Sequence, residues 1–259
     1  MKKQLVISTL AIMAIAALPT MAAPVQTFDV NPTLSATQAP GVWYTDRYAP
    51  NAFESVVFDG DNRLRLGIDD SDGANSRPGG FGSAFYNTQG RKYDVDTTYM
   101  CIDLWIPSEA YLAANVGTRF AGFWGTAIDA FNVISAYPIV EYRQDANGDF
   151  GFSVWNGAGW DDLGAPTGFA NEAWYSLEMV MVGDDVTFNV GDISHTVSYG
   201  LGTQSFTNAI LQGYNTTDGV TYDIYWDNFK TEPIPEPGTM VLLGMGIAGM
   251  AMRRFRKRA

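Results

Sequence analysis

The sequence predicts an all-β protein folded as a two-sheet antiparallel β-sandwich of the jelly-roll type. Between residues 25 and 230, no long stretch carries apolar residues at helical spacing, and short runs of alternating apolar and polar residues occur instead. Gly, Asn and Asp separate these runs, as expected for turns. Apolar residues make up 46% of the chain, which is enough to bury a sizeable core. Many short strands in one domain are typical of a sandwich.

Ten segments have the alternation that strands require. In 174–182, for example, the apolar residues lie two apart, so they would share one face of a sheet. The pairs Gly183-Asp184 and Asn147-Gly148 predict two hairpins, because these residues favour tight turns. The predicted strands are 55–58, 63–68, 99–106, 139–143, 150–155, 174–182, 185–190, 195–199, 210–214 and 222–229.

Residues 1–22 have the parts of a secretory signal peptide. Lys2 and Lys3 form a positive start, and an apolar run follows at 5–18. Small residues then lead to Ala22, after which we expect a signal peptidase to cut. An uncleaved anchor is the alternative, but the run is shorter than a membrane span requires. The protein is therefore expected to be exported.

The C-terminus combines three ordered features. Residues 231–237 form a Pro-rich spacer, 240–252 are all apolar or Gly, and 253–258 are mostly Arg and Lys. As a helix, the apolar run rises only about 20 Å, against about 30 Å of hydrocarbon in a bilayer. We therefore expect a short transmembrane helix that spans only if its arginines snorkel. The basic cluster would stay in the cytoplasm, with the body outside.

These three features, behind a signal peptide, resemble the PEP-CTERM sorting signal. Ile234 stands where the family often has Val, a small departure. The resemblance implies processing by an exosortase, a membrane transpeptidase-like enzyme of Gram-negative bacteria that make exopolysaccharide. It also implies an inner-membrane intermediate and a final place at the cell surface or in the extracellular matrix. An ordinary tail anchor is the alternative. The motif residues are Pro235, Glu236, Pro237, Arg253, Arg254 and Arg256.

The chain is expected to hold a single folded domain. Its one predicted helix lies around residues 108–115, where Ser108 can cap the first turn and Glu109 suits the positive end of the helix dipole. The predicted organisation is a signal peptide, a β-sandwich domain, a linker with the Pro-Glu-Pro motif, and a sorting segment with the Arg cluster. Their ranges are 1–22, 23–230, 231–237 and 238–258.

The charge is unevenly distributed along the chain. Lys and Arg total 16 against 28 Asp and Glu, a net charge of −12. The basic residues gather at both ends, so residues 23–238 hold 9 basic and 28 acidic residues, a net charge of −19. Such a body would repel phosphate backbones, which argues against nucleic-acid binding. One Cys and one His exclude an internal disulfide framework and a His-rich metal site.

Three segments of the body carry a second resemblance. They are Tyr137-Pro138-Ile139-Val140-Glu141-Tyr142, the stretch 151–164, and the closing Tyr225-Trp226-Asp227-Asn228-Phe229. In these segments the body resembles the concanavalin A-like lectin and glucanase superfamily. The resemblance implies a two-sheet sandwich and an association with glycans, although a fold by itself does not assign a function.

A glycan-binding loop is predicted from two tryptophans in a Gly-rich stretch. Trp155 and Trp160 would offer aromatic faces to a sugar, and Asn156 and Asp161 would supply hydrogen-bonding groups. The alternative is that both tryptophans pack in the core, which is common for large aromatic side chains. An exopolysaccharide is the expected partner of this loop.

A calcium site is the one metal site that the sequence suggests, and no other cofactor is expected. Asp145, Asn147 and Asp149 place three oxygen-bearing side chains at alternating positions, and calcium prefers such ligands. The alternative is a hairpin turn, because Asn147-Gly148 already explains the local sequence.

Catalytic residues are not expected, so the sequence-based prediction is a non-catalytic structural or glycan-associated protein. Glycoside hydrolysis needs two carboxylates on one face, and the pairs with suitable parity are Glu141 with Asp145 and Asp223 with Asp227. Neither pair stands in a recognised catalytic motif, and His195 has no Ser or Cys motif to serve. The alternatives are an extracellular glucanase-like enzyme and a calcium-dependent carbohydrate-binding module.

Overall fold

A computed structural model describes residues 26–70, 88–145, 147–214 and 221–232. These residues all belong to one compact unit, Pro24–Pro233. The predicted signal peptide, sorting motif and C-terminal helix lie outside the described residues. Within the described ranges, no helix is long and apolar enough to cross a membrane.

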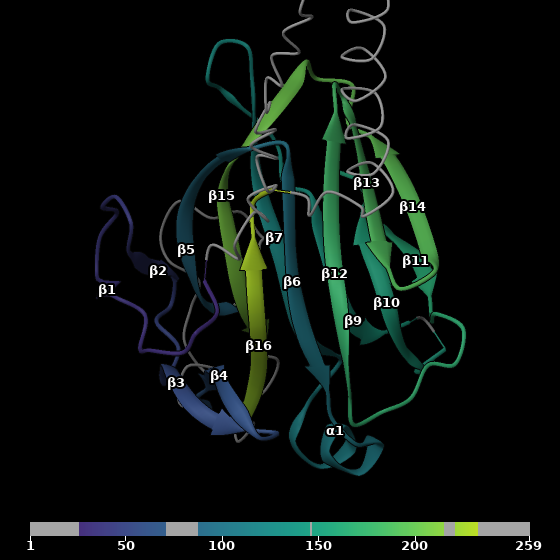
Figure 1. The fold of residues 1–259 in the computed structure, drawn as a ribbon. Helices are drawn as coiled ribbons and strands as arrows, with labels where there is room; N and C mark the ends of the chain where they lie inside the picture. The colour runs from purple at the N-terminus through teal and green to yellow at the C-terminus, as the bar shows by residue number, and fades with distance from the viewer. Residues whose placement is uncertain (1–25, 71–87, 146, 215–220, 233–259) are drawn as a thin grey trace, which may run out of the picture. The chain divides into compact units, whose positions relative to one another are not determined.

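The body is a sandwich of two sheets, as predicted (Figure 1). One sheet has nine strands in the order β1-β2-β5-β15-β7-β9-β10-β11, with β8 paired to β7, and the other has seven in the order β14-β13-β12-β6-β16-β4-β3. Every strand pairing is antiparallel except that of β1 with β2. The strands are β1 (Leu34–Ser35), β2 (Trp43–Arg47), β3 (Ala52–Phe58), β4 (Asp61–Ile68), β5 (Thr88–Thr97), β6 (Tyr99–Ile106), β7 (Arg119–Asp129), β8 (Ile134–Ala136), β9 (Ile139–Gln144), β10 (Phe150–Trp155), β11 (Trp160–Gly164), β12 (Ala173–Val182), β13 (Asp185–Val190), β14 (Ile193–Ser198), β15 (Thr203–Tyr214) and β16 (Tyr222–Lys230).

The core lies between the facing sides of the two sheets. Alternate residues of each strand point inward, such as Leu177 on β12 and Val140 on β9, and both are fully buried. Aromatic rings fill much of this space, with Trp43 packed 5.1 Å from Phe53 and 5.9 Å from Phe229, measured between ring centroids. A second, smaller apolar cluster, of Trp124, Ile139 and Ile210, lies on the outer face of the nine-stranded sheet.

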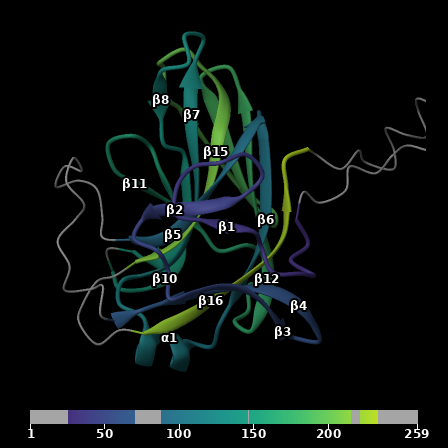
Figure 2. The same cartoon turned by 90° about the vertical axis from the view of Figure 1, so that its left-hand side faces the viewer.

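The helix α1 (Glu109–Asn115) begins where the sequence predicted it. The Ser108 hydroxyl accepts a hydrogen bond from the Tyr111 backbone N–H at 3.2 Å, which satisfies one of the free donors of the first turn. Both views place α1 and the β3–β4 hairpin at the same end of the sandwich (Figures 1 and 2).

All ten predicted strands are present, and both predicted hairpins are confirmed, β9–β10 and β12–β13. The strands that the sequence did not predict lack a clear alternation. In β7, for instance, the first nine of eleven residues are buried on both faces, so apolar residues and Gly follow one another without a break. β11 was predicted as part of a loop, yet it pairs with β10.

Candidate functional site

The outer face of the nine-stranded sheet carries two parallel rows of side chains. The strands pair in register, so residues on neighbouring strands lie directly opposite one another and point to the same side. One row is mainly aromatic and apolar, and we call it the aromatic row. It consists of Tyr44, Lys92, Ile210, Trp124, Ile139, Trp155 and Trp160.

The second row, the polar row, lies two residues further along each strand. It includes three carboxylates, and two of them, Glu141 and Asp162, lie on strands separated by β10. Two of its positions are glycines, and neighbouring groups closely approach both of them. The polar row consists of Asp46, Gly90, Gln212, Gly122, Glu141, Ser153 and Asp162.

Glu141 is the centre of a buried hydrogen-bond network. Arg119 holds its carboxylate with two donors: Nε lies 2.7 Å from Oε2, and Nη2 contacts Oε1. Oε1 also accepts hydrogen bonds from Gln212 Nε2 at 2.8 Å and Trp124 Nε1 at 3.2 Å. Both members of the ion pair are buried, with side-chain exposures of 4% for Arg119 and 1% for Glu141. Such a two-donor ion pair fixes the orientation of the Glu141 carboxylate.

Arginine side chains lie over the aromatic rings of this face. The guanidinium carbon of Arg143 is 4.4 Å from the centre of the Trp160 ring, and that of Arg119 is 5.2 Å from it. In the middle of the aromatic row, the guanidinium carbon of Arg47 lies 4.9 Å from the centre of the Trp124 ring. These distances are within the range of cation–π attraction, which fixes both partners.

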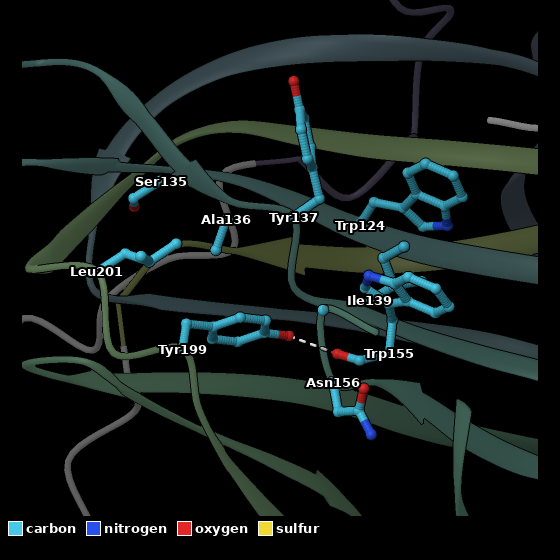
Figure 3. A pocket seen from close by; sticks show the side chains of 10 residues that line it. Trp124, Ser135, Ala136, Tyr137, Ile139, Trp155, Asn156, Tyr199 and Leu201 are labelled. Atoms are coloured by element: carbon cyan, nitrogen blue, oxygen red, sulfur yellow. Dashed lines mark hydrogen bonds between the residues drawn. The ribbon is translucent and has the colours of Figure 1, made fainter. Parts of the chain in front are cut away.

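A cavity of about 480 Å³ lies beside Trp155, the last residue of β10 (Figure 3). The rings of Trp124 and Trp155 form one side of it with Ile139, while Leu201 and Ala136 lie on the opposite side. The Tyr199 hydroxyl donates a hydrogen bond to the Trp155 carbonyl oxygen at 2.6 Å. Burial raises the pKa of Tyr199, so this donor stays protonated. The remaining lining residues are Ser135, Tyr137, Asn156 and Gly157, so no carboxylate or basic side chain from the described part of the chain lines this cavity.

A second cavity, of about 460 Å³, lies on the other side of Trp160. Charged and amide side chains line it, in contrast to the first cavity. The Trp155 and Trp160 rings, 5.5 Å apart and edge to face, stand between the two cavities. The lining residues are Arg143, Gln144, Asp145, Asn147, Ser153, Trp160 and Asp162.

The four predicted glycan-binding residues do not all reach the same space. Trp155 and Asn156 line the first cavity, and Trp160 lines the second. Asp161 points away from both, accepting a hydrogen bond from Asn156 Nδ2 at 2.8 Å and lying 3.1 Å from Nε2 of His195 on β14. His195 therefore joins the edges of the two sheets. The role of these residues in glycan binding stays a prediction.

The predicted calcium ligands form the turn between β9 and β10. Asp145 Oδ1 accepts hydrogen bonds from the backbone N–H groups of Asn147 at 2.7 Å and Asp149 at 3.0 Å, and its Oδ2 accepts one from the Asn147 side chain. These donors lower the pKa of Asp145, with the Asp149 N–H contributing most. Within the described ranges, no three His, Cys, Asp or Glu side chains are grouped to hold a metal. Calcium binding here stays a prediction, which a calcium-dependent melting temperature abolished by Asp145→Asn would test.

Other candidates from the sequence lie elsewhere. Asp223 and Asp227 point outward from the seven-stranded sheet, where Arg65 and Arg63 pair with them. Burial raises the pKa of the Cys101 thiol to about 12, so it is not a thiolate nucleophile at neutral pH.

Sequence reasoning missed three members of the Glu141 network: Arg119, Trp124 and Gln212. They lie on β7 and β15, which are distant in sequence from Glu141. The available signal was Gly122 inside a strand, since an interior Gly often marks a close approach of other groups.

Comparisons with solved structures return proteins that act on glycans. One is an endo-acting O-glycanase from the human gut microbiota, with 13% identity over 80% of this chain and 98% of that chain and a TM-score of 0.47. Another is a glycoside hydrolase family 16 endo-glucanase from Bacteroides ovatus, with 10% identity over 74% and 96% of the two chains and a TM-score of 0.45. A third, a sialidase, has 10% identity and a TM-score of 0.46 over 74% of this chain, and the chain spans only 17% of that protein's length. No curated protein matches the sequence.

These comparisons correct one sequence-based expectation. The protein was expected not to be an enzyme, but the similar structures are mostly glycoside hydrolases and lyases, so a non-catalytic assignment is not supported. Identities of 10–15% do not by themselves assign an activity to this chain.

The C-terminus gives the most specific match. Residues 233–257 match the PEP-CTERM protein-sorting motif, as the resemblance of these residues implied. The chain therefore carries an exosortase sorting signal, and this signal marks it as an exported protein.

Proposed function

We propose that this protein is a carbohydrate-active protein of the cell surface or extracellular matrix, which binds a polysaccharide chain on the outer face of its nine-stranded sheet. The signal peptide would bring it to the inner membrane, and signal peptidase and exosortase would process its two ends. The observation that carries the proposal is the aromatic row, which ends in the Trp155–Trp160 pair between two cavities.

The first cavity has the properties of a site for an uncharged sugar. Its lining is mostly aromatic and aliphatic, with a few polar groups that could fix orientation, as is usual for small-ligand sites. The Trp155 ring offers a flat apolar surface to the C–H face of a sugar ring.

The test is a binding measurement on the purified protein with neutral polysaccharides such as β-glucans. Trp155→Ala should weaken binding at least tenfold, because stacking on that ring is lost. Trp174→Ala is the matched control, since Trp174 is also partly exposed but lies on the seven-stranded sheet. Equal binding by wild type and Trp155→Ala would refute the site.

Glycan cleavage is the second candidate, and the polar row favours it. Glu141 and Asp162 both lie opposite Ser153, one on each side, so two strand spacings of about 4.8 Å separate their backbones. The two backbones are therefore about 9.6 Å apart, close to the upper limit of the carboxyl separation used by inverting glycosidases, about 6.5–9.5 Å. Glu141, whose orientation Arg119 fixes, would be the base, and Asp162, which lines the second cavity, would be the acid.

The release of reducing ends from a panel of polysaccharides tests this candidate. Cleavage that Glu141→Gln and Asp162→Asn each reduce at least a hundredfold, with binding retained, would support it. Binding without cleavage of any polymer in the panel would leave the protein as a binding protein.

The sorting signal has a separate test. Deletion of residues 235–258 should change where the protein accumulates, while its circular dichroism spectrum stays that of a folded β-protein. An unchanged location would contradict exosortase-dependent sorting.

A further inference from the structure

A third cavity, of about 410 Å³, lies on the other sheet, at the end where α1 and the β3–β4 hairpin meet. Phe58, Trp105, Asp223 and Tyr225, which line it, belong to strands of the seven-stranded sheet. The aromatic row lies on the nine-stranded sheet. Aromatic and acidic side chains dominate its walls, and among the described residues no Lys, Arg or His lines it. The lining residues are Phe58, Trp105, Pro107, Ser108, Tyr111, Phe120, Glu172, Asp223 and Tyr225.

The aromatic wall is built by a hairpin tip folded over the sheet. Phe58, the last residue of β3, stacks flat on Tyr225 of β16, with ring centroids 3.7 Å apart and planes 6° apart. The Trp105 ring meets Phe58 edge to face at 5.4 Å. The next residue of the tip, Asp59, accepts a hydrogen bond from Trp174 Nε1 at 2.9 Å. These contacts hold the rings in place before any ligand arrives.

The charge around this cavity is negative. Glu172 and Asp223 line it, and Glu54 lies just beyond. Arg65 is shared between two of these carboxylates, with Nε 3.1 Å from Asp223 Oδ1 and Nη1 3.6 Å from Glu54 Oε1. The Arg65 guanidinium therefore offsets only part of the charge of these three carboxylates. The body as a whole adds to this negative potential, with its net charge of −19 over residues 23–238.

We propose that this cavity binds an organic ammonium group, carried by an amine-bearing sugar residue of a polysaccharide. Aromatic faces attract cations through their ring quadrupoles, and carboxylates add a direct charge partner. The cavity falls within the range of ordinary ligand sites and exceeds the size of an ammonium group alone, so it leaves room for the sugar ring that carries the amine. Its chemistry differs from that of the first cavity, which has no charged lining residue.

The proposal has a consequence for the whole molecule. With an uncharged sugar site on one sheet and an ammonium site on the other, a single domain could hold two different glycan chains at once. This inference does not depend on the first site, because no residue lines both cavities.

The experiment compares three probes by calorimetric titration of the full-length protein at about pH 6, where a sugar amine is protonated. They are a glucosamine tetramer, the N-acetylglucosamine tetramer of the same length, and choline. We expect the glucosamine tetramer to bind at least tenfold more tightly than the acetylated one, which has lost the positive charge. Equal binding of the two tetramers would overturn the proposal. Choline binding as tightly as the glucosamine tetramer would overturn its sugar component.

Variants place the binding in this cavity. Glu172→Gln removes a charge at an exposed position and should weaken glucosamine-tetramer binding about threefold to tenfold. Trp105→Ala should have a larger effect, and the exposed Glu172 variant keeps the test valid if the Trp105 variant does not fold. Trp155→Ala is the control that should leave this binding unchanged while weakening neutral-glycan binding. Undiminished binding by Glu172→Gln and Trp105→Ala would refute the assignment.

Discussion

Gly122 on β7 lies directly opposite Glu141 on β9, and the Glu141 carboxylate occupies the space that a side chain at Gly122 would need. A Cβ atom at this position would lie 2.8 Å from Glu141 Oε1, 2.2 Å from Gln212 Nε2 and 2.6 Å from Trp124 Nε1. The glycine is therefore what allows three polar side chains from three strands to meet over one point of the sheet.

Gly122→Ala should destabilise the protein by about 1–3 kcal/mol, because the added methyl group forces the network apart. Urea unfolding followed by tryptophan fluorescence measures the change. Gly151→Ala is the matched control on the same sheet, since the nearest atom to its added Cβ would be Gly164 O at 3.7 Å. Equal stability of the two variants would contradict the crowding at Gly122.

Glu141→Ala should cost about 3–5 kcal/mol of unfolding free energy, because it leaves the Arg119 charge buried without its carboxylate. Glu54→Ala removes a carboxylate that lies 3.6 Å from the partly exposed Arg65, and should cost at most about 1 kcal/mol. Chemical denaturation of both variants gives the comparison. A loss at Glu141 as small as that at Glu54 would show that the network is not stabilising.

Stability should also respond to pH through Asp227. Burial raises the pKa of this carboxyl above its ordinary value of 3.8, against the opposing effects of the Asn228 N–H and Arg63. The folded state therefore binds this proton more tightly than the unfolded chain does, and the group's contribution to stability falls as pH rises through the interval above 3.8. Relative to Asp227→Asn, the wild type should gain stability as pH is lowered from about 7 to about 4. A difference that stays constant or shrinks would contradict the raised pKa.

Ser108→Ala should cost about 1 kcal/mol, because the first turn of α1 loses the hydroxyl that caps the Tyr111 N–H. Ser108→Asp keeps a side-chain acceptor at the same position and should restore most of the stability. Thermal unfolding of the three proteins measures the effect, and similar melting temperatures for the Ala and Asp variants would argue against the cap.

The parts of the fold that alternate in sequence could be predicted, and those buried on both faces could not. In β12 and β13 one face meets the core and the other meets water, so their period of two is visible. In β7 this contrast is lost, because residues on both sides of the strand are covered. The Asn147-Gly148 turn was recognisable because its conformation depends on local residue preferences.

The candidate site was predictable only where it is local. Trp155 and Trp160 stood out because a short Gly-rich turn connects them. The carboxylate pairs predicted from the sequence are spaced along one strand. Glu141 and Asp162 instead share a row that runs across three strands. Such a row depends on strand order and register, which a single sequence does not reveal.

The position of β16 determines how this domain responds to a pulling force. The strand is hydrogen-bonded to β4 on one side and β6 on the other, and Phe229 also bridges to Gln26. The sorting motif begins at residue 233, only a few residues after the strand ends at Lys230. If the chain were pulled from its C-terminal end, the force would run along β16 and would load the hydrogen bonds to β4 and β6 together. A domain held at this point should resist being torn open by flow, and its mechanical lifetime would be set by its unfolding rate.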